Sequence, residues 1–181
     1  SLENRIKFEF FYIPENKKMI SLEEKLKNPV WYSLEETHKK FLITHNDVQF
    51  YDPDICIFGA FYDSSKTSKA LNQYGKTVEK FFLLSENQTA EIDTNTTVLE
   101  KKIAGCQMVL ETLIDIEITE EIVILTEKHM DEIYDLIGLV MPGFYRRRGF
   151  EMGRFFGIFK NGKLIAISGQ RMQADDFIEV S

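Results

Sequence analysis

The sequence has few of the residues that build metal sites and disulfide frameworks. Its 181 residues include two cysteines and three histidines. Cys56 and Cys106 lie in apolar surroundings without metal-ligand spacing, which predicts free buried thiols in a reducing compartment rather than a disulfide. His38, His45 and His129 are dispersed and form no H-x-x-x-H pair, so no metal site is expected. No serine stands in a G-x-S-x-G motif, which argues against nucleophilic hydrolase chemistry.

Long apolar runs and an excess of positive charge are also missing. No run approaches the roughly 20 apolar residues of a membrane-spanning helix, and no signal peptide or lipidation motif is visible. Lys and Arg number 22 against 29 Asp and Glu, which gives a net charge of −7. Nucleic-acid binding needs clustered cationic groups instead. We expect a soluble, cytoplasmic protein that binds neither nucleic acid nor membranes.

Apolar residues are plentiful, and the first part of the chain shows helix-start signals. Hydrophobic residues make up 44% of the chain, which is enough for one good-sized core or two small ones. The aromatic run Ile6–Ile13 predicts a strand. Ser21–Glu24 and Ser33–Glu36 both fit a capping box, in which the hydroxyl caps a free amide and the glutamate reaches back. They predict a short helix from about Leu22 and a longer one over 34–43.

The middle of the chain predicts a mixture of short elements. Asp52-Pro53-Asp54 predicts a turn, and a brief helix is expected near Ala70. The apolar segments Val78–Leu84 and Ile103–Leu113 predict strands, with a turn at Asp93–Thr97 between them. Residues 117–121 are acidic, and we place a domain boundary there. Residues 1–118 would form an N-terminal α/β region and residues 119–181 a second domain.

The second part shows a clear order of elements. Ile122–Leu125 is a four-residue apolar run, the length of a buried strand. From Thr126 to Met141 the apolar residues recur at helical spacing, and Pro142-Gly143 ends that helix. Asn161-Gly162 lies between two apolar runs and predicts a hairpin with a type I′ turn. Phe177–Ser181 begins a further strand.

This order, together with the residues in it, resembles the start of a GNAT-type N-acetyltransferase fold. The likeness is densest from Pro142 onwards, where a helix ending in Pro-Gly-Phe precedes a basic loop and a Met-Gly pair. Upstream, Asn28–Trp31 and Tyr51–Asp54 resemble the extra N-terminal region of one group of these enzymes. The fold class expected is α+β, with the N-terminal α/β region followed by the first half of a GNAT-like fold with antiparallel strands. The other matching residues are Phe144, Met152, Gly153, Phe156, Gly157, Ile158, Gly162, Leu164, Ile165, Ala166, Gly169, Gln170, Arg171 and Met172, with Glu179, Val180 and Ser181 at the fourth strand.

The resemblance implies an acetyl-CoA-dependent enzyme that transfers an acetyl group to a primary amine by direct attack. In such enzymes a glycine-rich loop after the fourth strand cradles the pyrophosphate of acetyl-CoA with its backbone amides. The 181 residues contain no G-x-G, so we expect that they stop short of this loop and are inactive alone. The alternative is a non-catalytic binding or interaction module that retains half of the fold.

The resemblance also implies roles for particular residues. Glu179, on the fourth strand, resembles the glutamate that relays the proton of the acceptor ammonium through water; otherwise it is a surface glutamate. Phe144, Tyr145 and Arg146 would line the acceptor cleft, where an arginine can hold an acidic group, and Glu151 is a weaker candidate there. The alternatives are structural: the aromatic residues would pack in the core, and the charged residues would lie in a solvated loop.

The resemblance and the strand pattern also predict binding partners. The acceptor would be a small-molecule or peptide amine. The apolar strand 177–180 would present an open edge, which invites pairing with another chain and makes a homodimer possible.

Overall fold

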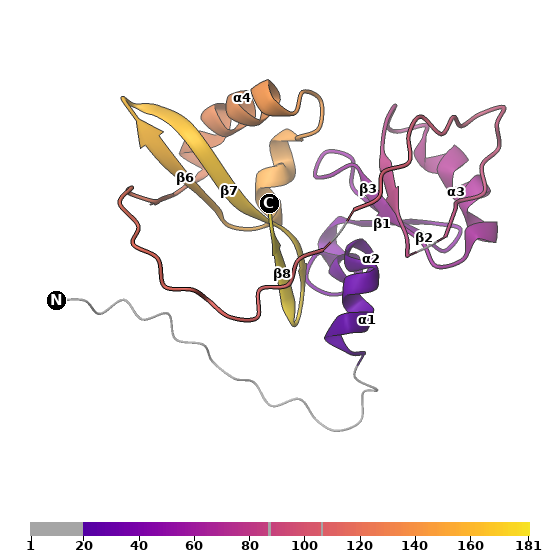
Figure 1. Cartoon of the computed structure of the whole chain (residues 1–181). Coiled ribbons are helices and arrows are strands. Elements are labelled where there is room, and N and C mark those ends of the chain that lie inside the picture. Colours follow the sequence, from indigo (N-terminus) through magenta and orange to yellow (C-terminus); the bar gives the residue numbers. More distant parts are fainter. Residues whose placement is uncertain (1–19, 87, 106) are drawn as a thin grey trace.

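Two four-stranded sheets make up the fold in the computed structural model, which describes residues 20–86, 88–105 and 107–181. Each sheet has its strands in sequence order, and short helices lie beside them (Figure 1). The mixed α+β class is therefore as expected. The strand expected at Ile6–Ile13 and the thiol of Cys106 lie outside the described residues. The short 3-10 turns are η1 (Lys39–Phe41), η2 (Ser64–Lys66), η3 (Glu127–His129) and η4 (Arg147–Met152).

The two predicted capping boxes have different outcomes. Helix α1 (Leu22–Lys27) begins as expected, because the Ser21 hydroxyl accepts a hydrogen bond from the Glu24 amide at 3.2 Å. The helix predicted over 34–43 is wrong. Helix α2 instead spans Pro29–Glu35, with Asn28 capping its first turn and proline at its first position. Those two residues favour an earlier start, so Ser33 is buried inside the helix.

The first sheet combines a hairpin with a parallel strand. Strands β1 (Leu42–His45) and β2 (Val48–Tyr51) are antiparallel, and β3 (Phe58–Ala60) pairs antiparallel with β2. The turn predicted at 52–54 is present, since the Asp52 carboxylate accepts from the Asp54 amide at 3.0 Å. Helix α3 (Thr67–Tyr74) confirms the helix near Ala70 and leads to β4 (Phe82–Leu84), which is parallel to β3. The strand predicted over 78–84 is thus shorter than expected.

The segment between the sheets has no regular structure where it is described, although a strand is predicted at Ile103–Leu113. Met108 is 96% exposed and Leu113 is 82% exposed. A strand needs a partner for its backbone amides and carbonyls, and this segment pairs with no described strand. That prediction is therefore wrong, while the turn at Asp93–Thr97 is confirmed by the Thr97 amide, which donates to the Asp93 carbonyl at 2.8 Å.

The second sheet follows the predicted order from strand to helix to hairpin to strand. Strand β5 (Val123–Ile124) is shorter than expected, and helix α4 (Met130–Val140) follows it. Gly143 has a φ of +77° where the chain leaves the helix. Asn161 and Gly162 have φ values of 52° and 73°, as a type I′ turn requires. The hairpin strands are β6 (Phe155–Lys160) and β7 (Lys163–Ala174), and β8 (Phe177–Val180) pairs antiparallel with β7 at the edge of the sheet.

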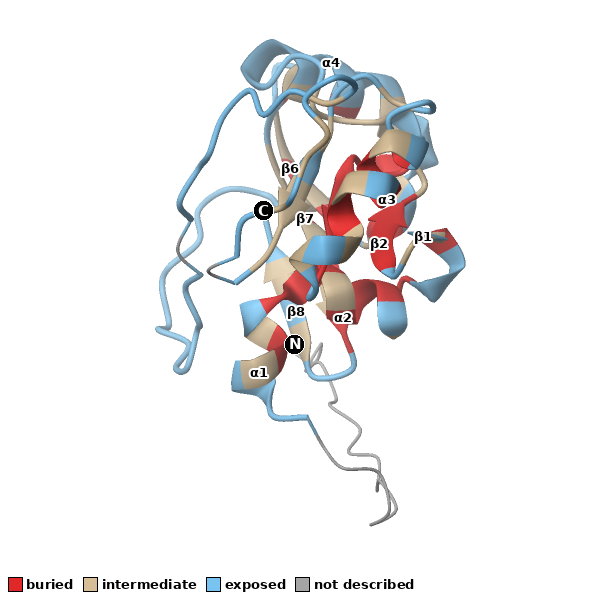
Figure 2. Cartoon of the chain, turned by 90° about the vertical axis from the view of Figure 1, so that its right-hand side faces the viewer, coloured by how far each residue is buried: buried red, intermediate tan, exposed pale blue. Residues whose placement is uncertain are grey.

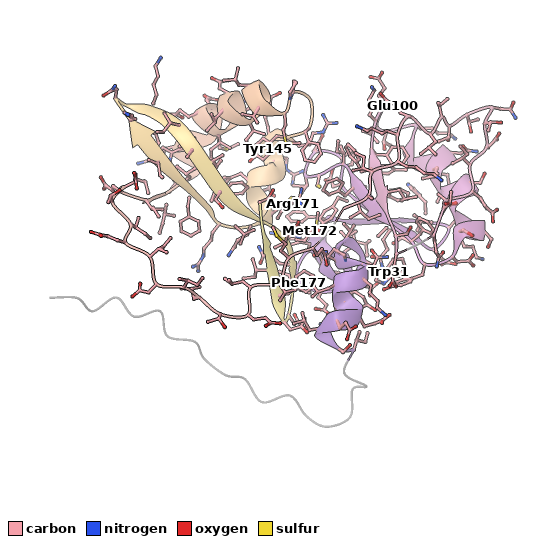
Figure 3. The ribbon with its side chains drawn as sticks, in the orientation of Figure 1. Trp31, Glu100, Tyr145, Arg171, Met172 and Phe177 are labelled. Atoms are coloured by element: carbon pink, nitrogen blue, oxygen red, sulfur yellow. The ribbon has the colours of Figure 1, made fainter. Side chains whose placement is uncertain are left out.

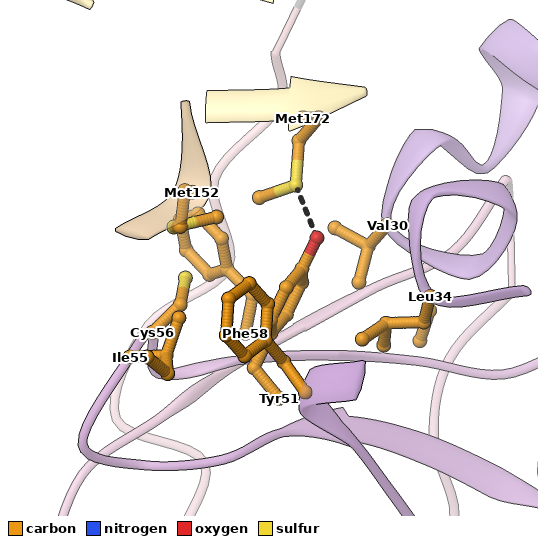
Figure 4. Packing of buried hydrophobic residues seen from close by; sticks show 10 residues of the cluster. Val30, Leu34, Tyr51, Ile55, Cys56, Phe58, Met152 and Met172 are labelled. Carbon is orange, nitrogen blue, oxygen red and sulfur yellow. Dashed lines mark hydrogen bonds between the residues drawn. The ribbon is translucent and has the colours of Figure 1, made fainter. Parts of the chain in front are cut away.

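The sheets share a hydrophobic core, which crosses the boundary predicted at residue 118. Figure 2 shows the buried residues concentrated in α2 and around β2, and Figure 4 shows Met172 beside the Tyr51 hydroxyl and Met152 above Cys56. The division into two domains stays a prediction, but both parts contribute side chains to one cluster. Its buried members are Val30, Leu34, Phe41, Tyr51, Ile55, Cys56, Phe58, Ala60, Met152 and Met172.

A buried lysine ties the turn between β7 and β8 to the first helices. Lys25 Nζ lies 2.7 Å from a Glu36 carboxylate oxygen and 3.0 Å from one of Asp176. Burial alone would lower the pKa of Lys25, but its hydrogen bonds to Glu36 and Asp176 outweigh burial and raise the pKa. The other Glu36 oxygen accepts from the Asp175 amide at 2.7 Å. This contact holds the far end of the second sheet against the N-terminal region.

We expect Met172→Ala to destabilise the N-terminal region although Met172 belongs to β7. Its side chain is 2% exposed, and truncating a buried methionine leaves a cavity that costs about 2–5 kcal/mol. Trp31 is the single tryptophan and lies in α2, so urea unfolding followed by its fluorescence reports on the N-terminal region. The midpoint should fall.

Met141→Ala is the matched control, because Met141 is 48% exposed and its loss should cost about 0.5 kcal/mol or less. An unchanged Trp31 transition in the Met172→Ala protein would show that the two sheets do not depend on one core.

Candidate functional site

The central polar feature of the candidate site is an ion pair across strands β7 and β8. Arg171 Nε donates to Glu179 Oε2 at 3.0 Å, and Arg171 Nη2 donates to the other carboxylate oxygen. Both side chains are 32% exposed. Two parallel hydrogen bonds of this kind fix the orientation of both groups. Glu179 is therefore reachable from solvent but held in one position.

The arginine of this pair lies against the shared core. Its guanidinium carbon is 5.5 Å from the centre of the Phe58 ring, a distance at which the ring face attracts a cation. Burial would lower the pKa of Arg171, but its hydrogen bonds to Glu179 and that carboxylate's charge raise it. Arg171 therefore stays protonated. Figure 3 shows Arg171 and Met172 between the two sheets, with Tyr145 nearer to α4.

Three phenylalanine rings from both parts of the chain meet beside this arginine. The centre of the Phe58 ring lies 5.6 Å from those of Phe82 and Phe144, and the last two are 5.5 Å apart. These contacts are edge-to-face or tilted, as aromatic pairs prefer. Phe82 is 39% exposed and Phe144 is half-buried. We call Phe58, Phe82 and Phe144 the phenyl triad.

A buried histidine lies beneath the site. His38 is 2% exposed; its Nε2 lies 2.8 Å from the Met152 carbonyl oxygen and its Nδ1 lies 2.8 Å from the Tyr51 hydroxyl. A carbonyl can only accept, so Nε2 carries the proton and Nδ1 accepts from Tyr51. The single hydroxyl proton of Tyr51 is then committed to His38. The Met172 sulfur, 3.3 Å from the same hydroxyl, is a packing contact that completes the cluster.

Burial keeps the neighbouring thiol and imidazole uncharged. Desolvation raises the pKa of Cys56 to about 12, so this free thiol is not a nucleophile at neutral pH. The free buried state predicted for Cys56 is confirmed. Desolvation also lowers the pKa of His38, with a smaller contribution from Lys40, although the Met152 carbonyl opposes the shift. The groups around the ion pair are therefore neutral.

The predicted cleft residues after Phe144 point elsewhere. Tyr145 packs against Phe155 with ring centres 6.3 Å apart, and burial raises its pKa to about 12. Its hydroxyl is buried without a hydrogen-bond partner among the described residues, and so is the Nε of half-buried Arg146. Glu151 is exposed and takes two hydrogen bonds from Arg148, at 2.7 and 3.1 Å.

The structure thus joins two of the predicted site residues into one neighbourhood. Glu179 binds Arg171, and the Arg171 guanidinium lies over the Phe58 ring. Phe58 in turn contacts Phe144. Tyr145 and Glu151 make their contacts in other places. Sequence reasoning missed Arg171, Phe58 and Phe82 as site residues. The acidic dipeptide at 175–176 predicts the turn, but in regular register that turn would place Met172 opposite Glu179. The register shift between Gln170 and Gln173 brings Arg171 beside Glu179, and no local signal marks that shift. No local signal marks Phe58 or Phe82.

Two negative findings concern the described residues alone. Across 20–86, 88–105 and 107–181, no group of three or more His, Cys, Asp or Glu side chains is placed to hold a metal ion. In the same ranges no helix has the length and apolar character needed to cross a membrane.

Comparison with known proteins identifies the fold. No family model and no curated protein matches the sequence. The chain is similar to a crystal structure of a protein assigned to the GNAT family of acetyltransferases, from Novosphingobium aromaticivorans, with a TM-score of 0.61 and 21% sequence identity. The likeness covers 86% of this chain and 68% of that one. The fold is therefore GNAT-like, in agreement with the resemblance read from the sequence.

We expect acid to destabilise the protein through His38. Its pKa is lowered by folding, so its contribution to stability is complete above the ordinary value of about 6.5 and is lost as pH falls towards the folded pKa. The free energy of unfolding should fall by at most about 1.4 kcal/mol per pH unit from this group. Urea titrations between pH 5 and 8 measure it.

His38→Gln keeps a side chain that can donate and accept hydrogen bonds, but it removes the titratable imidazole. This variant should be less stable at pH 8, and its stability should depend less on pH than that of the wild type. Parallel curves for the two proteins would show that His38 is not the group that senses acid.

Proposed function

We propose that the protein is an N-acetyltransferase, which transfers an acetyl group from acetyl-CoA to a primary amine. The observation that carries this proposal is a partly exposed carboxylate, Glu179, on the strand of a GNAT-like fold that follows the β6–β7 hairpin. Transfer requires that the acceptor ammonium lose a proton before its nitrogen attacks the thioester carbon. The C–S bond then breaks, and coenzyme A leaves as the thiol.

Glu179 is suited to take the proton in spite of its ion pair. A carboxylate has about four lone-pair sites, and Arg171 occupies two of them. The remaining sites can accept from the ammonium or from a water that relays its proton. Arg171 would act as a positioning residue, because it holds the carboxylate in one orientation without touching the acceptor nitrogen.

No described residue is assigned to acetyl-CoA. Pyrophosphate binding in a fold of this kind needs backbone amides in a glycine-rich turn that opens a helix. Among residues 20–86, 88–105 and 107–181 no glycine-rich strand-to-helix turn of that form is present. The proposal therefore concerns the acceptor half of the reaction.

A binding module without catalysis is the second candidate. One observation favours it: Glu179 is bound by Arg171 in a geometry that also serves to join β7 to β8. In that case the ion pair is structural, and neither acetyl-CoA nor an amine would be turned over. The same experiments separate the two candidates.

We expect Glu179→Gln to lower kcat by about 10²- to 10⁴-fold, the usual contribution of general acid–base catalysis. Release of coenzyme A by the full-length natural chain, with a panel of primary amines, measures this rate. Glu100→Gln is the matched control, since Glu100 is also ion-paired, with Lys80 at 3.1 Å, but lies outside the site. It should retain full activity.

Binding of acetyl-CoA, followed by calorimetry, complements the rates. An enzyme of this kind should bind acetyl-CoA. If the protein does not bind acetyl-CoA and no amine is acetylated, the enzyme proposal fails and the binding module remains. Equal rates for wild type and Glu179→Gln would instead remove Glu179 from the mechanism.

A further inference from the structure

We infer that the phenyl triad binds the apolar part of the acceptor, so that the acceptors are amines carrying an aromatic or bulky aliphatic group. This inference rests on the proposed function and names its substrate class. It also makes the N-terminal sheet part of the acceptor site, because Phe58 belongs to β3 and Phe82 to β4.

The first argument is the exposure of one ring. Phe82 is 39% exposed, and among the described residues it is the one phenylalanine whose side chain is this open. Its ring contacts Phe58 and Phe144, and part of its surface faces solvent. An apolar ligand would remove that surface from water, which is favourable in proportion to the area covered.

The second argument is the charge beside the rings. Phe58 already lies within cation–π distance of the Arg171 guanidinium, at 5.5 Å, so this cluster of rings tolerates a cation at its faces. Glu179 accepts from Nε and Nη2 of the same guanidinium and keeps unused lone-pair sites. An ammonium linked to an apolar group can therefore meet a carboxylate at one end and ring surface at the other.

The third argument is that the rings of the triad carry no hydrogen-bonding groups. Phenyl side chains neither donate nor accept ordinary hydrogen bonds, so a hydroxylated or carboxylated amine would lose water without replacement there. Arg171, whose guanidinium carbon lies 5.5 Å from the Phe58 ring centre, is already bound by Glu179. The site therefore favours an apolar amine over a polar one of similar length.

The test compares two probes and three variants of the full-length natural chain. Binding of 2-phenylethylamine and of ethanolamine is measured by calorimetry without acetyl-CoA. We expect 2-phenylethylamine to bind at least tenfold more tightly than ethanolamine. Phe82→Ala should weaken its binding about tenfold, and Phe82→Leu should weaken it less, because leucine keeps apolar contact but loses the ring.

Tyr134→Ala is the matched control. Tyr134 on α4 is also 39% exposed and lies under a cation, with the Arg147 guanidinium carbon 4.7 Å from its ring centre. This variant should bind 2-phenylethylamine as the wild type does. Thermal unfolding of each variant confirms that a weaker affinity does not come from loss of the fold.

The outcomes separate this inference from the proposed function. Binding that depends on Phe82, without acetylation of any amine, would support the inference while the proposed enzyme fails. Acetylation of amines without preference for 2-phenylethylamine, and with no effect of Phe82→Ala, would overturn the inference and leave the enzyme. Absence of 2-phenylethylamine binding to the wild type would also overturn it.

Discussion

His38 lies between the two parts of the molecule and makes one hydrogen bond to each. It accepts from Tyr51 of the first sheet and donates to the Met152 carbonyl at the entrance to the second. The carbonyl requires a proton on Nε2, and burial favours the neutral imidazole by lowering the pKa of His38. In this arrangement the His38 imidazole is buried and uncharged. The shared core, the position of β7 and the site beside it depend on these two hydrogen bonds.

An irregular stretch of β7 connects the core to the site. Met172 is buried against Tyr51, and the adjacent Arg171 is directed to Glu179 on β8. The register of β7 and β8 shifts between Gln170 and Gln173, and such an irregularity interrupts the regular alternation of side chains. Arg171 lies over the ring of Phe58, which belongs to the same core cluster as Met172. A site built in this way is positioned by hydrophobic contacts that lie outside it. The Lys25 contact with Glu36 and Asp176 holds the same hairpin at its turn.

Sequence reasoning succeeded where the signal is local and failed where it depends on distant partners. Asn161-Gly162 and the cap at Ser21 act through neighbouring backbone groups, and both were predicted. Ser33 carries the same capping pattern, but Asn28 and its proline start the helix earlier. Residues 103–113 have the composition of a strand without a described partner. The phenyl triad joins three segments whose proximity no local pattern encodes, so only one of its members was predicted.

The shared core has a consequence for synthesis on the ribosome. Tyr51 and Met172 are 121 positions apart in the chain. At translation rates of about 5–20 residues per second, roughly 6–24 seconds separate the addition of these two residues. During that interval the apolar face of the nascent N-terminal sheet lacks its cover and is open to non-native association. A chaperone that covers the face until β7 emerges would prevent that association.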